Sequence, residues 1–383
     1  MKRSKLWLFC LVGLLICPSV QTQDVNTPEG LIQSVKDAVK RAMIEGHIPS
    51  LTIALVRGEK IIWSDGFGDA NLWAHTPAVP ETVYLIGSTF KTMSTYALLQ
   101  QMEQGKFKLD DPVSSYLNGI KIKDENPEHP VTFRHLLTHT SGLPGDFGPH
   151  PVWGDTVPPS LEAYLVKSLR VIHPPLSKLV YSNMAFTLVA YLIQKFSGVP
   201  FKDYMRKNIL MAADMKDTDF FPRRDMEERL SVPYIYSPEE DRQIPAARLK
   251  ADVWPAGIVY GTVLDQANWL ITNLNGGIFN GHRLIDSASF DKMMSVQYER
   301  FNGPLGGGWL NENTGYGLTW WMTPFMGDTL FAHSGSVPGY TAFLAGDVDN
   351  KTGVAILTNG NRAHPHLYRL AKKALDLLKL NEN

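Results

Sequence analysis

A serine and a lysine lie three residues apart in the segment 86–92, as Ser88 and Lys91. Apolar residues follow at helical spacing, and no glycine or proline interrupts the chain before Gly105, which predicts a helix with Ser88 in its first turn. Residues at i and i+3 share a helix face, so the lysine amine should lie beside the serine oxygen. A buried neutral lysine can activate a serine nucleophile, and a helix N-terminus favours the developing negative charge. The pair predicts nucleophilic catalysis, although Ser-x-x-Lys alone also fits a capped helix with a solvated lysine.

A tyrosine and an asparagine form a second motif, Tyr181-Ser182-Asn183, directly before another predicted helix. A phenol at Tyr181 can carry a proton to a leaving group, and the Asn183 amide can bind a substrate amide or position Lys91. The alternative is structural: a half-buried tyrosine followed by a helix-capping asparagine.

The third motif is His333-Ser334-Gly335-Ser336, at the end of a predicted strand. Gly335 lacks a side chain, so a ligand can approach the backbone there. The backbone N–H of Ser336 can pair with that of Ser88 as an oxyanion hole, in which one donor contributes roughly 10²–10³ in rate. The alternative is a strand turn with a structural histidine.

Both ends of the chain predict sheet structure, and the middle predicts helices. Thr27-Pro28-Glu29 is typical of a helix start, and apolar runs at 51–56 and 60–63 predict a β-hairpin. Further helices are expected at 184–196, 201–210, 262–273 and 367–380, and further strands at 317–322, 329–332, 341–344 and 353–357. We therefore expect a mixed α/β protein of the α+β type: one antiparallel sheet flanked by terminal helices, with a helical lobe and the active site between the two lobes.

The predicted organisation is a signal peptide at 1–23 followed by one domain at 24–383. Within that domain, the sheet lobe comprises 24–87 and 305–383, and the helical lobe comprises 88–304. The length of 383 residues predicts either one large domain with lobes or two domains, because single cores stop growing beyond about 250–300 residues. The net charge of −1 offers no reason to propose a nucleic acid or an anionic membrane as partner.

The signal peptide is predicted from three basic residues, Lys2, Arg3 and Lys5, followed by an apolar run at 6–17. The run is too short for a stable transmembrane anchor, so we expect an exported protein in the periplasm or outside the cell. Both cysteines, Cys10 and Cys17, lie in this segment, and bulky Ile16 argues against lipidation at Cys17. The mature chain is then free of cysteine and of disulfides.

Together the three motifs resemble those of the penicillin-recognising serine hydrolases: class C β-lactamases, D-alanyl-D-alanine carboxypeptidases, D-aminopeptidases and related esterases. The resemblance extends to nearly the whole mature chain, through the segments 109–113, 135–143, 255–257, 316–318 and 357–360 and through Asp265. It implies a β-lactamase/transpeptidase-like fold in which Ser88 is acylated and Lys91 and Tyr181 jointly move protons, without deciding which of the two is the base. It also implies that Asn183, His333, Gly335 and Ser336 contact the substrate.

One position departs from the class C β-lactamases, which carry Lys-Thr-Gly where this chain has His-Ser-Gly at 333–335. A lysine keeps a fixed charge for a substrate carboxylate, whereas a histidine is mostly neutral near pH 7. This departure favours a peptidase or esterase over an efficient β-lactamase.

The resulting prediction is an exported serine hydrolase that cleaves amides or esters through a Ser88 acyl-enzyme. Its partner would be a small molecule or short peptide, including a cell-wall peptide or a β-lactam. No cofactor or metal is expected, since His135-x-x-x-His139 has helical metal-ligand spacing but no third ligand. The alternatives are a carboxylesterase, a weak class C-like β-lactamase, and a penicillin-binding sensor or scaffold that does not turn over.

Overall fold

The computed structural model describes residues 27–145, 151–152, 160–251, 253–299, 314–325 and 327–381. The predicted signal peptide and the predicted lobe boundary at 304/305 lie outside these ranges.

The described residues form one large antiparallel sheet built from the two ends of the chain. Its strand order is β12-β13-β14-β15-β16-β1-β2-β3. The strands are β1 (Ser50–Arg57), β2 (Lys60–Asn71), β3 (Thr76–Pro77), β12 (Gly315–Tyr316), β13 (Trp321–Phe325), β14 (Asp328–Val337), β15 (Tyr340–Asp347) and β16 (Thr352–Thr358). The predicted hairpin pairs β1 with β2, and β1 also pairs with β16 from the other end of the chain, Ile53 opposite Ile356.

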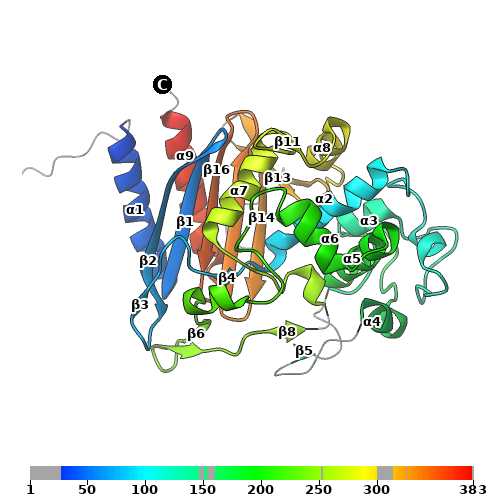
Figure 1. Cartoon of the computed structure of the whole chain (residues 1–383), viewed down its shortest axis with the longest axis horizontal. Coiled ribbons are helices and arrows are strands. Elements are labelled where there is room, and N and C mark those ends of the chain that lie inside the picture. Colours follow the sequence, from blue (N-terminus) through cyan, green and yellow to red (C-terminus); the bar gives the residue numbers. More distant parts are fainter. Residues whose placement is uncertain are drawn as a thin grey trace, which may run out of the picture.

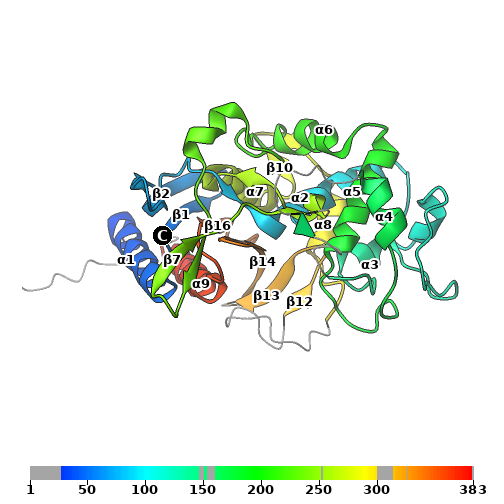
Figure 2. The same cartoon turned by 90° about the horizontal axis from the view of Figure 1, so that it is seen from below.

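Helices cover both faces of the sheet. Those in the described residues are α1 (Pro28–Glu45), α2 (Phe90–Glu103), α3 (Phe133–Leu137), α4 (Leu161–Ser168), α5 (Asn183–Ser197), α6 (Phe201–Met205), α7 (Val263–Leu274), α8 (Ser287–Met294) and α9 (His364–Leu380). The terminal helices α1 and α9 lie together on one face, and α7 lies on the other (Figure 1). The view from below shows the strands between these two layers (Figure 2). Thus α7 packs on the sheet, although its residues belong by sequence to the predicted helical lobe.

Short two-stranded pairs complete the connections between these elements. They are β4 (Tyr84–Leu85) with β9 (Tyr260–Gly261), β5 (Pro151–Val152) with β8 (Lys250–Ala251), β6 (Tyr234–Ser237) with β7 (Arg242–Pro245), and β10 (Ile278–Phe279) with β11 (His282–Arg283). The β4–β9 pair lies directly before the Ser88 segment, and Ile86 N donates to Val259 O at 2.9 Å, so the pairing continues to the residue before the Ser88 turn.

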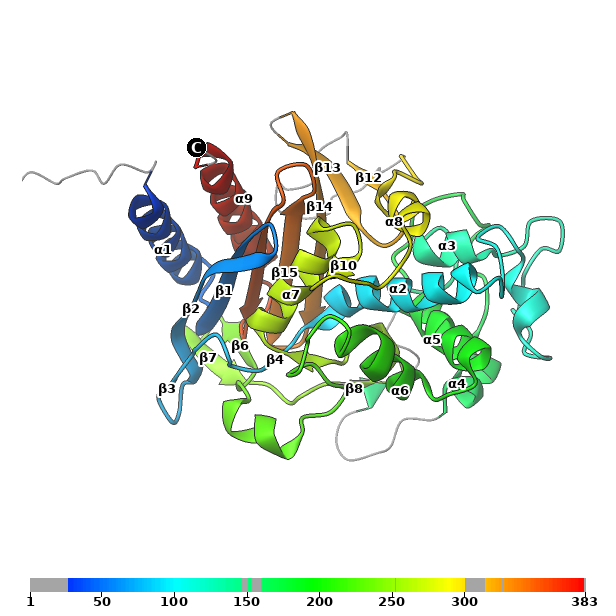
Figure 3. The same cartoon turned by 45° about the horizontal axis from the view of Figure 1, so that its top comes forward.

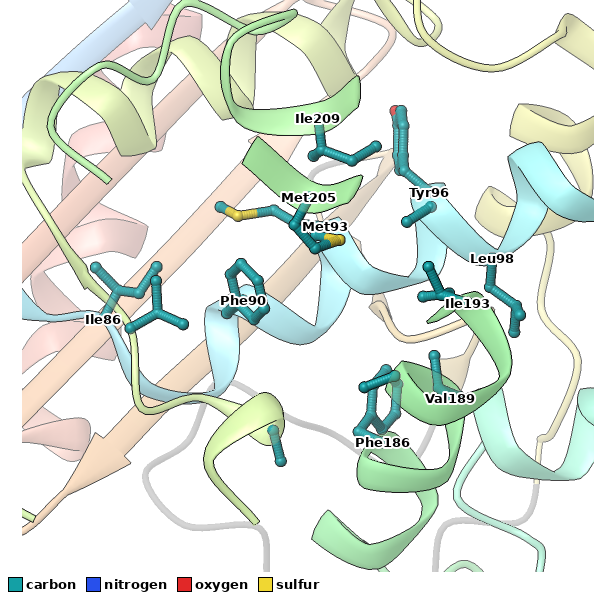
Figure 4. Close-up of a cluster of buried hydrophobic side chains, with 14 of the residues drawn as sticks. Ile86, Phe90, Met93, Tyr96, Leu98, Phe186, Val189, Ile193, Met205 and Ile209 are labelled. Atoms are coloured by element: carbon teal, nitrogen blue, oxygen red, sulfur yellow. The ribbon is translucent and has the colours of Figure 1, made fainter. Parts of the chain in front are cut away.

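The helix α2 connects the sheet to the helical region, where it runs beside α5 (Figure 3). Nearly all of its side chains are buried, including polar ones, which is typical of a central helix. Figure 4 shows Phe90 and Met93 of α2 near Met205 of α6, and Phe186 and Val189 on the neighbouring α5. Removing such a buried side chain costs about 2–5 kcal/mol, so this packing holds the Ser88 end of α2 firmly.

The predicted strand at 317–322 is wrong over its first four residues, and only 321–322 belong to a strand. The segment 317–322 is not continuous: β12 ends at Tyr316, and β13 begins at Trp321. Thr319 between them has a φ of +79° and donates its N–H to Leu137 O at 2.9 Å, so the chain turns there. The apolar pattern reflects burial of Leu318 and Trp320 in the core rather than strand pairing.

Within the described residues, no single helix is long and apolar enough to cross a membrane. The helical segments Asn183–Ser197 and Phe201–Leu210, bent by 81° relative to each other, meet that test only as a pair.

Candidate active site

Ser88 lies in a tight 3₁₀ turn, Gly87–Thr89, that leads directly into α2. Gly87 has a φ of +58°, a left-handed conformation that glycine adopts without strain. Thr89 Oγ1 donates to Ile86 O at 3.0 Å, and Trp269 Nε1 of α7 donates to Thr92 Oγ1 at 2.8 Å. These bonds fix the turn that presents Ser88, which is the helix-start position expected from the sequence.

The Lys91 amine contacts three oxygens. Its Nζ lies 2.9 Å from Ser88 Oγ, 2.9 Å from Asn183 Oδ1 and 2.5 Å from the carbonyl oxygen of Ala256. The i, i+3 spacing thus brings the serine and lysine together as predicted. The contact with Ala256 was not predicted. Every residue has a backbone carbonyl, so the sequence does not indicate which one will contact the lysine.

The surroundings of Lys91 disfavour its charged form. The side chain is fully buried, with 0% of its surface exposed. Burial lowers the pKa of Lys91 well below the ordinary value of a lysine. No carboxylate is among its hydrogen-bond partners in the described structure, so an amine that is neutral near pH 7 fits this environment.

The N-terminus of α5 carries the tyrosine motif. The Ser182 side chain caps the helix by accepting from Ala185 N at 3.0 Å, and Asn183 Nδ2 donates to Gly145 O at 3.1 Å. Asn183 Oδ1 therefore faces Lys91 in a fixed orientation. Of the two roles considered for Asn183, positioning Lys91 is the one visible in the structure.

The Tyr181 ring packs beside the lysine, its centroid 4.9 Å from Lys91 Nζ. Burial raises the pKa of Tyr181 above that of an ordinary phenol, and the nearby Ser88 hydroxyl offsets part of this rise. The phenol oxygen is buried and makes no hydrogen bond of normal geometry with the described residues. It is therefore a protonated hydroxyl close to Ser88, free to bond with a bound molecule.

His333 lies on β14, with its ring centroid 6.3 Å from that of Tyr181. Its Nδ1 lies 2.7 Å from Ser334 O, so Nδ1 carries the proton and Nε2 is left as an acceptor. Burial lowers the pKa of His333 to about 3, assisted by the nearby Lys91 amine. The imidazole of His333 is therefore neutral near pH 7. This agrees with the expectation from the sequence that a histidine here, unlike the lysine of class C β-lactamases, carries no fixed charge.

Glycines let β14 and the 253–258 segment approach the Ser88 turn. A Cβ on Gly335 would lie 2.1 Å from Ile86 O, and one on Gly87 would lie 2.8 Å from Ser336 N. Gly257 has a φ of +150°, and its Cβ would lie 3.0 Å from Ser88 N. The backbones of Ser88 and Ser336 are thus held together, as an oxyanion hole requires. The close approach of Gly257 to the Ser88 backbone was not predicted from the sequence.

A small depression opens at Ser88. It is lined by Ser88, Asn183, Val253, Ala256, Gly257, Ile258, Ser336 and Val337. All seven residues predicted to form the site (Ser88, Lys91, Tyr181, Asn183, His333, Gly335 and Ser336) therefore lie around one point, where α2, α5 and β14 meet. In the described residues no cluster of three His, Cys, Asp or Glu side chains suitable for a metal is present.

The family model named Beta-lactamase matches residues 35–379, which is most of the chain. This chain belongs to the Beta-lactamase family. Members of the family are serine hydrolases, and the α+β fold described above is the β-lactamase/transpeptidase-like fold.

Similar sequences include Protein flp of Staphylococcus aureus strain MW2, 22% identical over 86% of this chain. The present chain spans 63% of the length of that relative. Another is the unguisins hydrolase ungD' of Aspergillus campestris, 25% identical over 93% of this chain and 67% of its own length.

Two solved structures share the fold. The octameric penicillin-binding protein homologue from Pyrococcus abyssi has a TM-score of 0.76 and 29% identity, covering 91% of this chain and 77% of its own. A class C beta-lactamase has a TM-score of 0.74 and 19% identity, covering 92% of this chain and 98% of its own.

Proposed function

We propose that this Beta-lactamase-family protein cleaves amide or ester bonds through an acyl-enzyme on Ser88, as a peptidase of the DD-peptidase or D-aminopeptidase kind or as a broad-specificity relative. The observation that carries the proposal is the set of three contacts around Lys91 Nζ. A neutral amine has two N–H donors and one lone pair. The Asn183 amide oxygen and the Ala256 carbonyl can only accept, so both N–H groups are directed to them. The lone pair is then left for the Ser88 hydroxyl proton, which is the arrangement of an activated nucleophile.

The proton has a second possible route through Tyr181. Its phenol is protonated and close to Ser88, so it can donate to a leaving group once Ser88 has attacked, and it regains a proton from the Lys91 ammonium, which carries the proton taken from Ser88. Lys91 would then act as the base and Tyr181 as the acid. The reverse assignment requires a phenolate already in the resting enzyme, before Ser88 attacks, and burial disfavours that form.

His333 bears on the substrate class. Its neutral ring supplies an acceptor where a lysine would supply a fixed charge, so a substrate carboxylate gains no ion pair there. This supports peptides and esters over β-lactams as good substrates, and it makes a carboxylesterase the second candidate activity. β-Lactams would acylate slowly.

The test of the nucleophile uses a fluorophosphonate probe. We expect the wild-type chain to be labelled at Ser88 and Ser88→Ala not to be labelled, because the hydroxyl is the attacking group. Peptide mapping of the labelled protein locates the adduct, and Ser94→Ala, a buried serine one and a half turns further along α2, is the matched control. Equal labelling of wild type and Ser88→Ala would remove Ser88 from the mechanism.

The alternative to an enzyme is a binding protein that is acylated at Ser88 but does not hydrolyse the acyl group. Intact-protein mass spectrometry after exposure to a penicillin separates the two. A transient adduct supports an enzyme, a permanent adduct supports a sensor, and hydrolysis of short-chain p-nitrophenyl esters without an adduct supports an esterase. We further propose that the partner is a small molecule or short peptide and that the chain is exported, both of which remain sequence-based predictions.

A further inference from the structure

The loop 139–145 runs beside the segment that carries Tyr181 and holds it by hydrogen bonds. The bonds are Leu176 N to Thr140 O (2.8 Å), Val180 N to His139 O (2.8 Å), Ser182 Oγ to Pro144 O (2.6 Å) and Asn183 Nδ2 to Gly145 O (3.1 Å). This loop contains the second histidine of the His135-x-x-x-His139 spacing, which the sequence assigns to packing and loop hydrogen bonds rather than to a metal site.

His139 contacts the chain on both sides of Tyr181, and we call this set of contacts the His139 bracket. The residue before Tyr181 donates its N–H to the His139 carbonyl at 2.8 Å, and the residue after it, Ser182, donates its N–H to His139 Nδ1 at 3.0 Å. The imidazole also packs on the phenol, with ring centroids 4.1 Å apart and planes tilted by 32°. One residue therefore fixes the backbone on each side of Tyr181 and the ring itself.

The charge state of His139 suits this role. Because Nδ1 accepts from an N–H, the proton of the neutral ring is on Nε2. The side chain is fully buried, and burial, with further effects of Lys91 and His333, lowers the pKa of His139 well below its usual value. A protonated ring would lose the bond from Ser182 and would repel a charged Lys91.

The backbone of His139 is also unusual. Its φ is +56°, in the left-handed region that histidine, asparagine and aspartate enter more readily than other non-glycine residues. In this conformation both the carbonyl and the side chain of His139 accept hydrogen bonds from the segment 180–182.

We propose that His139 is a positioning residue that aims the Tyr181 hydroxyl at the reacting centre; this inference rests on the function proposed above. Tyr181 needs such support because its own hydroxyl makes no hydrogen bond of normal geometry with the described residues. A displacement of about 1 Å at a catalytic group can cost about 10²-fold in rate. Removing the contacts between His139 and the segment 180–182 should therefore lower kcat/KM measurably.

The experiment is a double-mutant cycle with ethyl acetate, whose leaving ethoxide is a much stronger base than a phenolate and needs a proton from Tyr181. His139→Phe keeps a ring but removes the Nδ1 acceptor, and we expect kcat/KM to fall by about 10- to 100-fold. His139→Asn places an amide oxygen where Nδ1 lies and tolerates the positive φ, so we expect a rate within about threefold of wild type. In a Tyr181→Phe background, His139→Phe should cause no further loss, because its effect acts through the phenol.

His135→Phe is the matched control, since it removes a similar bond, from Thr132 N to His135 Nδ1 at 3.2 Å, in the neighbouring helix α3. It should lower thermal stability but leave kcat/KM unchanged. The inference is overturned if His139→Phe lowers the rate by the same factor with and without Tyr181, or if it has no effect. If His139→Phe does not fold, the test uses His139→Asn. A loss of kcat/KM above about tenfold in that variant, at normal thermal stability, would show that His139 does not position Tyr181 through its Nδ1 acceptor. Failure of wild type to form a Ser88 adduct would instead overturn the proposed function.

Discussion

At the scale of single residues, the site depends on the lone pair of the Lys91 amine pointing at the Ser88 hydroxyl. Burial lowers the pKa of Lys91 and so favours its neutral form, and the orientation of the amine follows from two partners that can only accept. The serine itself contributes a common functional group, and the chemistry comes from what surrounds it.

The first prediction concerns the charge of this amine. Because burial lowers the pKa of Lys91, the rate of Ser88 labelling should rise with pH through an apparent pKa well below the usual lysine value of about 10.4, as the amine loses its proton. Lys91→Arg keeps the donors but cannot lose a proton, and we expect it to slow labelling by about 10²–10⁴-fold. Labelling by a fluorophosphonate measured across pH checks both expectations.

The control for that experiment is Lys195→Arg on α5, a lysine that bonds to Asn118 Oδ1 at 2.8 Å near the surface. It should label at the wild-type rate. A Lys91→Arg variant that labels equally fast would show that the amine is not the base.

At the scale of elements, the decisive feature is how closely β14 approaches the Ser88 turn. Gly335 faces Ile86 O without room for a side chain. The β14 backbone can therefore supply a second N–H beside that of Ser88 only while this position remains a glycine.

We accordingly predict that Gly335→Ala lowers the rate of Ser88 acylation by about 100-fold or more, because its Cβ would push β14 away from the turn. Gly353→Ala on β16 is the control. Its Cβ would meet a movable side-chain atom, Leu274 Cδ1, at 3.2 Å, and acylation should be near normal. Fluorophosphonate labelling rates compared at equal folded fraction provide the measurement, and equal rates for the two variants would contradict the prediction.

At the scale of the whole molecule, α7 ties the sheet to the segment 214–231 through a buried carboxyl. Asp265 Oδ2 accepts from Asp217 N at 2.8 Å and from Thr218 Oγ1 at 2.7 Å. Burial raises the pKa of Asp265 to about 7, and the nearby Asp217 carboxylate adds to this rise.

This shift predicts a pH-dependent stability. In the unfolded chain an aspartate has a pKa of about 3.9, so the unfolded state loses this proton first as the pH rises. The stability due to the protonated carboxyl is present below about pH 4 and is lost as the pH rises through about 7. Asp265→Asn cannot ionise, and the difference in melting temperature between variant and wild type should therefore move in favour of the variant from about pH 5 to about pH 8. Calorimetric melting temperatures that differ by the same amount at both pH values would contradict it.

Local patterns in the sequence determined much of this protein. The Ser88–Lys91 contact follows from the i, i+3 geometry of one helix, and the β1–β2 hairpin follows from two neighbouring runs. The cap of α1 by Thr27 is equally local. These features involve residues close together in the chain, whose geometry depends little on the rest of the molecule.

The tertiary structure decided the rest. The Ala256 carbonyl at Lys91, the bracket of His139 around Tyr181 and the turn at Thr319 join residues far apart in the chain. The lowered pKa values of Lys91 and His333 come from burial, which depends on all the elements packed around the two side chains. Residue types alone predicted which groups could react, whereas packing shifts the pKa values of these groups and fixes the orientation of their side chains.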